Sequence, residues 1–292
     1  MTDESWTIGS LLAWTTEYLQ KHGVDTPRLD AEVLLAEANG CQRIDLYTAY
    51  NDQADEKTRV AYRELVSRRA QGMPVAYLVG RREFYSHDFR VNTDVLIPRP
   101  ETEFVLVELL DLVKQVNRGP LEIADVGTGS GILAVCTALH IPECRITAID
   151  ISTAALEVAQ TNATSHGVQD RVEFVESDLL ASVERDKQWD FIVSNPPYVS
   201  ESEWKDLATD VRNYEPRLAL VAGTTGTEVI SKIIQQSPQH LRAGGWLIME
   251  ISPMILEPVK SLFTSTSGWN SIRIIEDLAH YPRVVAAQWR DQ

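Results

Sequence analysis

Hydrophobic positions along the first 90 residues change from a helical to a strand-like spacing. Between Ile8 and Leu19 apolar residues recur every three or four positions, and Gly23 then favours the end of a helix. Beyond residue 70 the apolar runs are short and lie between glycine, proline and charged residues, which is typical of strands. The predicted elements are helices over residues 8–19, 29–36 and 55–70 and short strands over residues 75–80, 83–85 and 89–91. We therefore expect a small helical domain over residues 1–90 that ends in a short β-hairpin linker.

From about residue 120, helix-like and strand-like segments alternate. The predicted order is strand 121–126, helix 132–139, strand 145–149, helix 154–166, strands 172–175 and 189–193, helix 228–241 and strand 246–251. Such alternation predicts a mostly parallel sheet with helices on both faces. The last two predicted strands, 271–276 and 284–289, leave no room for a crossover helix, so we expect an antiparallel pair. Residues 91–292 are thus expected to form an α/β, Rossmann-like domain.

A glycine-rich turn joins the first predicted strand of this domain to its helix. The turn consists of Gly127, Thr128, Gly129, Ser130 and Gly131. Glycines permit positive φ and let a ligand approach the backbone, but the spacing is not the G-x-G-x-x-G that grips a pyrophosphate. About 20 residues further on, Asp150 ends the next strand, where an acidic side chain can accept from both ribose hydroxyls. Together these features predict a nucleoside pocket, although Asp150 is also a candidate helix cap before Ser152.

A second polar turn follows the apolar strand that ends at Ser194. It consists of Asn195, Pro196, Pro197 and Tyr198. Consecutive prolines give a stiff turn whose carbonyl groups remain available as acceptors. An NH2 group can therefore donate to Asn195 Oδ1 and to the Pro196 carbonyl, while the Tyr198 ring packs against a planar substrate. The position predicts an active site for a planar amino or amide group, although Asn and Pro also form ordinary turns.

The net charge of −15 argues against a nucleic-acid target, because such binding relies on Lys and Arg neutralising phosphates. Charge is unevenly distributed. Residues 57–90 contain eight basic and three acidic side chains, a local charge of +5 that leaves −20 for the remaining residues. This stretch is either a solvated helix face with a hairpin or a docking surface for an acidic protein partner.

Cysteine usage and the N-terminus indicate where the protein works. Cys41, Cys136 and Cys144 are odd in number and have no C-x-x-C spacing, so we expect neither a disulfide framework nor a zinc site. No apolar run approaches the roughly 20 residues of a membrane span, and no basic segment precedes an apolar one at the N-terminus. We expect a cytoplasmic, monomeric protein without a membrane association.

Four sequence elements resemble those of one enzyme family over nearly the whole chain. The elements are Leu96–Glu103 (LIPRPETE), Asp125–Gly131 (DVGTGSG), Ser194–Tyr198 (SNPPY) and Tyr214–Pro216 (YEP). The chain resembles the S-adenosylmethionine-dependent protein N5-glutamine methyltransferases, and in particular those that act on peptide chain release factors. The resemblance implies a seven-stranded class I methyltransferase sheet of order 3-2-1-4-5-7-6. It also implies S-adenosyl-L-methionine as the cofactor, S-adenosyl-L-homocysteine as the product and no metal.

Further residues receive roles through this resemblance. The glycine turn, Asp150 and Asn195 are implied to bind the cofactor, and Asp178 is implied to contact adenine. Leu179 is also implied to bind the cofactor, but it departs from the aromatic residue that relatives often have there, so its contact with adenine is expected to be weaker or aliphatic. The segment Glu250–Pro253 departs from the expected E-x-G-x-x-Q. Arg99, with Glu101 and Glu103, either lines the cleft between the domains or belongs to an Arg–Glu pair that holds the linker.

The implied reaction is methylation of the glutamine amide in the Gly-Gly-Gln motif of class 1 release factors. An amide nitrogen is a poor nucleophile, so positioning by Asn195 and Pro196 is the expected source of catalysis, with Pro197 and Tyr198 completing the substrate site. The uninterrupted P-R-P in LIPRPETE favours release factors over a ribosomal protein, for which P-R-S-P is expected. Methylation of a ribosomal protein glutamine, methylation of an exocyclic amino group of a nucleobase, and a non-catalytic binding protein are the alternatives.

Overall fold

The computed structural model describes residues 6–116 and 119–290. These residues divide into two compact units. The first runs up to Arg81 and also includes Ala208–Tyr214, and the second comprises Arg82–Leu207 together with the chain from Glu215 onward. The expected division of labour between a docking domain, 1–90, and a methyltransferase domain, 91–292, stays a prediction.

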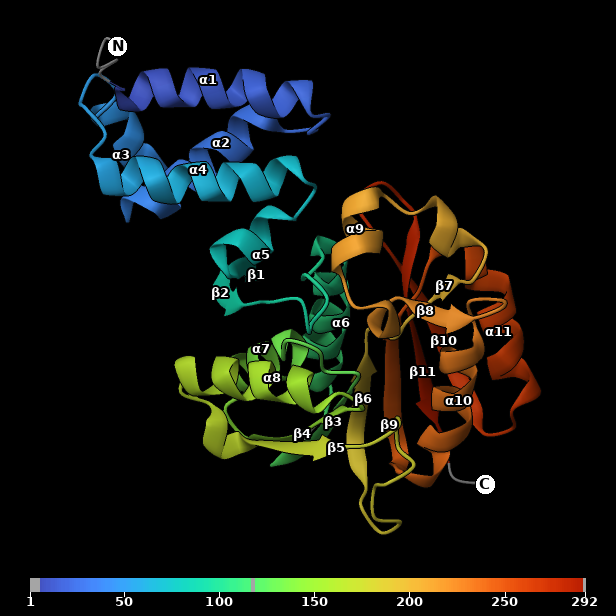
Figure 1. The fold of residues 1–292 in the computed structure, drawn as a ribbon. Helices are drawn as coiled ribbons and strands as arrows, with labels where there is room; N and C mark the ends of the chain where they lie inside the picture. The colour runs from blue at the N-terminus through green and yellow to red at the C-terminus, as the bar shows by residue number, and fades with distance from the viewer. Residues whose placement is uncertain (1–5, 117–118, 291–292) are drawn as a thin grey trace. The chain divides into compact units, whose positions relative to one another are not determined.

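The first unit is a cluster of helices (Figure 1). Its helices are α1 (Ile8–Lys21), α2 (Pro27–Asn39), α3 (Arg43–Thr48), α4 (Glu56–Ala70), α5 (Val75–Val79) and α9 (Thr209–Tyr214). Side-chain caps start α1 and α4, since Thr7 Oγ1 accepts from Ser10 N at 3.1 Å and Asp55 Oδ1 accepts from Thr58 N at 2.7 Å. Apolar side chains at helical spacing, including Leu12 and Leu19, meet in one buried core.

The prediction of a strand over residues 75–80 is wrong, because Val75–Val79 forms the short helix α5. Pro74 fixes a φ suited to the start of a helix, and Gly80 ends it in the left-handed conformation at φ 71°. Short apolar runs of this length do not distinguish a buried helical turn from a strand. The hairpin predicted next is present as β1 (Arg81–Phe84) and β2 (His87–Arg90).

Within the described residues of the second unit, seven strands form the main sheet. They are β3 (Leu121–Val126), β4 (Cys144–Asp150), β5 (Val172–Glu176), β6 (Trp189–Ser194), β9 (Leu241–Glu250), β10 (Trp269–Glu276) and β11 (Pro282–Trp289). Their order across the sheet is β5-β4-β3-β6-β9-β11-β10, with β3 to β6 and β9 parallel and β11 antiparallel to both neighbours. This topology confirms the expected class I methyltransferase fold, including the order 3-2-1-4-5-7-6.

Helices cover both faces of the sheet (Figure 1). They are α6 (Glu103–Val113), α7 (Ile132–His140) and α8 (Thr153–Ser165) on one face and α10 (Glu228–Gln236) and α11 (Leu256–Ser265) on the other. Neighbouring residues of a strand serve opposite cores: Phe191 and Val193 pack with the first group, and Ile192 packs with the second. A strand buried on both faces therefore reads as an uninterrupted apolar run.

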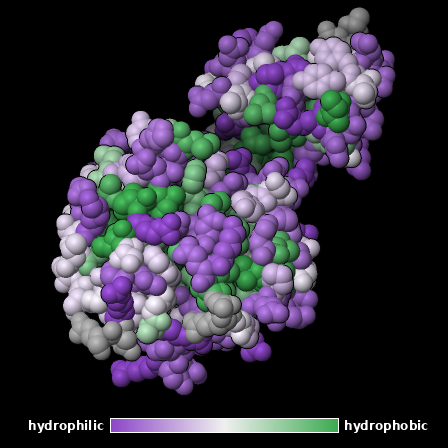
Figure 2. All heavy atoms as spheres, turned by 180° about the vertical axis from the view of Figure 1, so that it is seen from behind, coloured by the Kyte–Doolittle hydropathy of each residue, from purple (hydrophilic) through white to green (hydrophobic). Residues whose placement is uncertain are grey.

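The remaining elements are short or shorter than predicted. A two-stranded sheet pairs β7 (Val199–Ser200) with β8 (Val221–Gly223), and 3-10 turns connect several elements. The predicted helix 228–241 stops at Gln236, because Pro238 follows within a 3-10 turn and β9 begins at Leu241. Figure 2 shows hydrophilic side chains over much of one face of the molecule, with hydrophobic patches between them.

Neither a membrane-spanning helix nor a cluster of metal ligands occurs among residues 6–116 and 119–290. None of the helices there is long and apolar enough to cross a membrane. In the same part of the chain, no group of three or more His, Cys, Asp or Glu side chains is arranged to hold a metal ion. Cys136 and Cys144 are buried free thiols, and burial raises their pKa values to about 12 and about 11.

Candidate functional site

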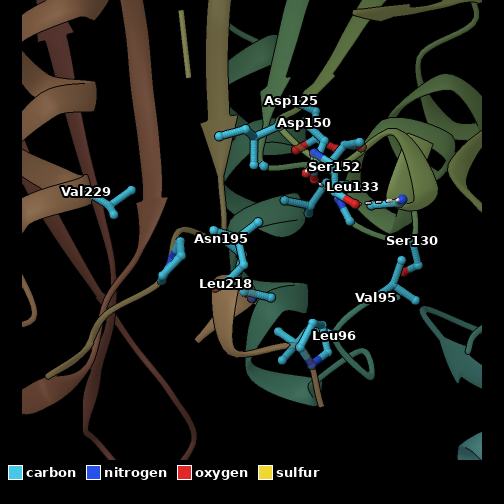
Figure 3. A pocket seen from close by; sticks show the side chains of 18 of the residues that line it. Val95, Leu96, Asp125, Ser130, Leu133, Asp150, Ser152, Asn195, Leu218 and Val229 are labelled. Carbon is cyan, nitrogen blue, oxygen red and sulfur yellow. Dashed lines mark hydrogen bonds between the residues drawn. The ribbon is translucent and has the colours of Figure 1, made fainter. Parts of the chain in front are cut away.

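A cavity of ≈ 220 Å³ opens at the carboxyl ends of the central strands. Because parallel strands end at one edge of the sheet, the glycine turn after β3, Asp150 at the end of β4 and Asn195 after β6 meet there. The predicted site residues that line the cavity are Gly127, Thr128, Gly129, Ser130, Asp150, Asp178, Leu179, Asn195 and Pro197. In Figure 3, Asn195 lies between Asp150 and Leu218, which also line the cavity.

The glycine turn has the backbone conformation that its sequence predicts. Gly127, Gly129 and Gly131 all have positive φ, at 73°, 55° and 81°. Gly131 has a second requirement, since a Cβ there would lie 3.0 Å from Ala159 Cβ and 3.1 Å from Ala159 Cα of α8. Gly131 does not line the cavity. What the structure shows for Gly131 is that it lets α7 and α8 pack closely next to the turn.

Asp150 joins the turn to the neighbouring strand. Its Oδ2 accepts from Gly129 N at 2.9 Å, and its Oδ1 accepts from Ser152 N at 3.0 Å. Ser152, not Asp150, is the N-cap of α8, because its hydroxyl accepts from Ala155 N at 3.2 Å. Burial raises the pKa of the Asp150 carboxyl against these hydrogen bonds. A carboxylate has about four acceptor positions, so Asp150 can accept further hydrogen bonds from a ligand in the cavity.

Asp125 is a lining residue to which the sequence analysis gave no role. Its side chain is 1% exposed, and its Oδ2 accepts from Thr128 Oγ1 at 2.7 Å and from Ala134 N at 3.1 Å. Burial raises the pKa of Asp125 to about 7. The sequence did contain a signal for Asp125: an acidic residue within an apolar strand, directly before the glycine turn, indicates a buried carboxyl with a specific role.

Replacing Asp125 by asparagine is expected to change how stability depends on pH. With the pKa of Asp125 raised from 3.8 to about 7, the folded chain keeps a proton that the unfolded chain releases as the pH rises from about 4 to about 7. The wild type therefore loses up to about 1.4 kcal/mol per pH unit from this group, and Asp125→Asn does not. In urea unfolding, the free energy of unfolding of the variant should rise relative to that of the wild type as the pH rises to about 7, and the difference should then stay constant. A pH-independent difference would contradict this assignment.

The side-chain amide of Asn195 is held from behind by a hydrogen bond. Its Nδ2 donates to Thr102 Oγ1 at 2.9 Å, and Thr102 Oγ1 donates to Glu250 Oε2 at 2.6 Å. Thr102 lines the cavity as well, and it lies in the LIPRPETE element. No role was predicted for Thr102, although the LIPRPETE element contains it.

Tyr198 and Pro196 occupy the rear of the same turn. Neither is among the described residues that line the cavity. The Tyr198 ring packs against the core shared with α10 and α11, and its hydroxyl donates to Glu250 Oε1 at 3.1 Å. Burial, followed by the nearby Glu250, raises the pKa of the Tyr198 hydroxyl. The predicted contacts of Tyr198 and Pro196 with a substrate stay predictions.

Arg99 belongs both to the cavity wall and to an ion pair. Its Nη2 lies 2.5 Å from Glu215 Oε1, and Glu215 Oε2 accepts from Ile97 N at 3.1 Å. Glu215 therefore anchors the LIPRPETE segment through its backbone and its arginine. Glu103 Oε1 accepts from Tyr85 N at 3.0 Å in the hairpin. Glu215 and Glu103 thus hold the LIPRPETE segment and the hairpin, and Arg99 lines the cavity beside its ion pair. The predicted position of Arg99, Glu101 and Glu103 in a cleft between domains stays a prediction.

Asp178 and Leu179 form the wall that follows β5. Asp178 is exposed, and Leu179 is half-buried with its side chain against the sheet core. Leu179 adopts a left-handed φ of 54°, which is unfavourable for a branched side chain. The structure therefore presents an aliphatic surface to the cavity where an aromatic residue was expected from the resemblance.

Two family models match the chain. The model described as the PrmC N-terminal domain matches residues 10–80, and the model described as the methyltransferase small domain matches residues 105–212. The first match covers most of α1 through α5, and the second runs from α6 through β6 and β7 into α9.

Similar proteins of known name or structure agree with the matches. The chain is 48% identical to the release factor glutamine methyltransferase of Rhodopirellula baltica, over 98% of this chain and 97% of that protein. It is 40% identical to the protein of the same name from Koribacter versatilis, over 93% and 95% of the two chains. The catalytic domain of hMettl16, solved with the MAT2A 3′UTR hairpin 6, shares the fold with a TM-score of 0.56 at 17% identity, over 78% of this chain and 82% of that one.

Proposed function

The chain belongs to the release factor glutamine methyltransferase family, and on that premise we propose that it methylates the side-chain amide nitrogen, N5, of the glutamine in the Gly-Gly-Gln motif of class 1 release factors. The observation that carries the proposal is the carboxamide of Asn195, which reaches the cavity at the end of β6 and is held by Thr102. A fixed amide oxygen is a suitable acceptor for the NH2 group of glutamine.

The cavity fits S-adenosylmethionine by the chemistry of its walls. Positive φ values at Gly127 and Gly129 leave the backbone open to close approach, with no atom within 4 Å of a Cβ built at either position. Asp150 offers acceptor positions for ribose hydroxyls, and Leu179 offers an apolar surface for the base. Asp178, at the exposed edge, is assigned to the adenine amino group. When bound, S-adenosylmethionine supplies the electrophilic methyl group.

The proposed catalytic contribution of the protein is orientation of the nucleophile. The lone pair of an amide nitrogen is delocalised into its carbonyl, so the nitrogen must be held in line with the methyl group. Asn195 Oδ1 and the Pro196 carbonyl oxygen would accept hydrogen bonds from the two N–H groups of the glutamine amide. As positive charge develops on nitrogen, these two acceptors stabilise it. After the methyl group is transferred, the N–H protons of the methylated amide cation are very acidic. One of them is lost without help, so the mechanism requires no dedicated base.

The first unit is the proposed docking site for the release factor. A cavity of ≈ 400 Å³ there is lined by aromatic and basic side chains, among them Trp14, Tyr18, Arg59 and Arg63. Trp14 stacks on Tyr18 with ring centroids 5.0 Å apart. The exposed Trp14 ring and the half-buried Tyr18 ring, next to guanidinium groups, suit an acidic protein surface. Arg69 instead forms an ion pair with Asp30, so part of the basic stretch has a structural role.

We infer a cytoplasmic monomer that binds its protein substrate and does not bind nucleic acid directly. The overall acidic charge of the chain, with one local basic stretch, supports a protein and not a nucleic acid as the binding partner.

Labelled methyl transfer tests the proposed function directly. The protein is incubated with methyl-labelled S-adenosylmethionine and, separately, a class 1 release factor, ribosomal proteins, or nucleic acid. Peptide mapping should place the label on the glutamine of Gly-Gly-Gln. Label on a ribosomal protein glutamine or on a nucleobase, with none on the release factor, would establish one of the alternatives instead.

Replacing Asp150 by alanine is expected to weaken S-adenosylmethionine binding by roughly ten- to hundredfold, since hydrogen bonds to a charged acceptor are lost. Calorimetric titration measures the change. Asp170→Ala is the matched control, because it removes an exposed acid that is not among the described lining residues. Equal affinities for the Asp150 and Asp170 variants would exclude Asp150 from the cofactor site.

A further inference from the structure

We propose that Thr102 is a positioning residue that, together with Glu250 and Tyr198, fixes the amide of Asn195 with its oxygen toward the substrate. The inference rests on the proposed function and deepens it. It explains why the enzyme selects an NH2 donor as the nucleophile at this site. Thr102, Tyr198, Asn195 and Glu250 all belong to the second unit.

The hydrogen bonds form a chain with a definite direction. Tyr198 Oη donates to Glu250 Oε1 at 3.1 Å, and Thr102 Oγ1 donates to Glu250 Oε2 at 2.6 Å. A threonine hydroxyl has one proton, so its commitment to Glu250 leaves Thr102 Oγ1 able only to accept. Asn195 must then present its NH2 group to Thr102, at 2.9 Å, and its Oδ1 must point away from Thr102. The ionised carboxylate thus sets the orientation of an amide two hydrogen bonds away.

Burial of Thr102 and Glu250 makes the reversed orientation of the Asn195 amide unfavourable. Thr102 is fully buried and Glu250 is 2% exposed, so water does not replace a misplaced partner. With the Asn195 amide reversed, two oxygen acceptors would face each other across the Thr102 contact. An unsatisfied buried polar group disfavours the reversed orientation by roughly ten- to hundredfold. Without Thr102, the two amide orientations become comparable, and the reversed one presents a donor to the glutamine NH2.

The charges around Glu250 make the device sensitive to pH. Glu101 faces its carboxyl as a like charge, and Arg283 faces it as an opposite charge, while Arg99 and Arg283 lie near Tyr198. Burial is the largest influence and raises the pKa of Glu250 to about 7. A protonated Glu250 can donate a hydrogen bond to Thr102 Oγ1. The Thr102 hydroxyl is then free to donate to Asn195 Oδ1, which favours the reversed orientation of the Asn195 amide. Turnover is therefore expected to fall below about pH 7.

Thr102→Val tests the proposal, because valine keeps the shape of threonine and removes the acceptor. We expect the kcat for release factor methylation to fall by about twofold, because about half of the Asn195 amides are then reversed. KM and S-adenosylmethionine affinity should stay within about twofold, and the acid limb of the pH profile should weaken. Thr102→Ser should restore both the rate and the limb. A kcat for Thr102→Val equal to that of the wild type, with its acid limb unchanged, overturns the proposal.

Two further measurements keep the test independent of folding and of the substrate assignment. Glu250→Gln retains Thr102 but offers a neutral partner, so its rate should be reduced and lack the acid limb near pH 7; an unaltered limb contradicts the proposal. NMR of the Asn195 side-chain NH2 needs no substrate. Its protons should exchange slowly in the wild type and faster in Thr102→Val, and equal exchange contradicts the proposal. If the wild type leaves release factor unmethylated, the proposed function fails while this spectroscopic test still stands.

Discussion

Replacing Asn195 by alanine is expected to lower methyl transfer to a release factor by roughly two to three orders of magnitude. The variant loses the acceptor that aligns the glutamine nitrogen, and it leaves Thr102 without its donor. The glycine turn and Asp150 remain, so S-adenosylmethionine affinity should change by no more than a few-fold. Single-turnover rates give the first quantity, and calorimetric titration gives the second.

The matched control is Gln235→Ala, which removes an exposed carboxamide of α10 outside the cavity lining. Its turnover and cofactor affinity should equal those of the wild type. Near-normal turnover in Asn195→Ala would remove Asn195 from the mechanism. A parallel loss of cofactor affinity would instead make it mainly a cofactor ligand.

Gly131→Ala is expected to destabilise the second unit by roughly 2–4 kcal/mol. Two causes add: the φ of 81° is unfavourable for alanine, and the new methyl group would lie 3.0 Å from Ala159 Cβ and 3.1 Å from its Cα. The backbone of α8 must then shift. Because α7 and α8 support the turn from below, cofactor affinity should fall with stability. Urea unfolding measures the free energy of unfolding.

Gly167→Ala separates the two causes. Gly167 has a similar φ of 69°, and no atom lies within 4 Å of a Cβ at that position. Its substitution should therefore cost only the conformational part, about 1–2 kcal/mol. Equal losses for the two glycines would show that the close packing of α7 on α8 contributes nothing measurable.

The sheet was predictable because its strands and turns carry local signals. The segments Leu121–Val126 and Trp189–Ser194 are buried on both faces, so their apolar runs stand out in the sequence. The glycine turn and Asn195 were placed correctly at the edge of the sheet because each follows a strand directly. The sheet order came from the resemblance, since periodicity does not specify which strands are neighbours.

Long-range contacts were beyond the reach of local patterns. Thr102 and Glu250 are separated by 148 residues, and their hydrogen bond depends on how the start of α6 meets the end of β9. The helix α5 was mistaken for a strand because five apolar residues between a proline and a glycine fit both structures. The roles assigned to Asp178, Leu179 and Tyr198 stay predictions, since the geometry gives only their positions.

The short helix α9 has a consequence for the ancestry of the protein. Ala208–Tyr214 groups with the first unit although the residues on either side belong to the second, and Tyr214 Oη donates to Gln71 O at 3.0 Å. The chain therefore passes between the units three times, at residues 81–82, 207–208 and 214–215. A single genetic crossover near residue 81 that joined the units of two divergent relatives would pair α9 of one parent with the helices of the other. The two units are thus expected to have been inherited together.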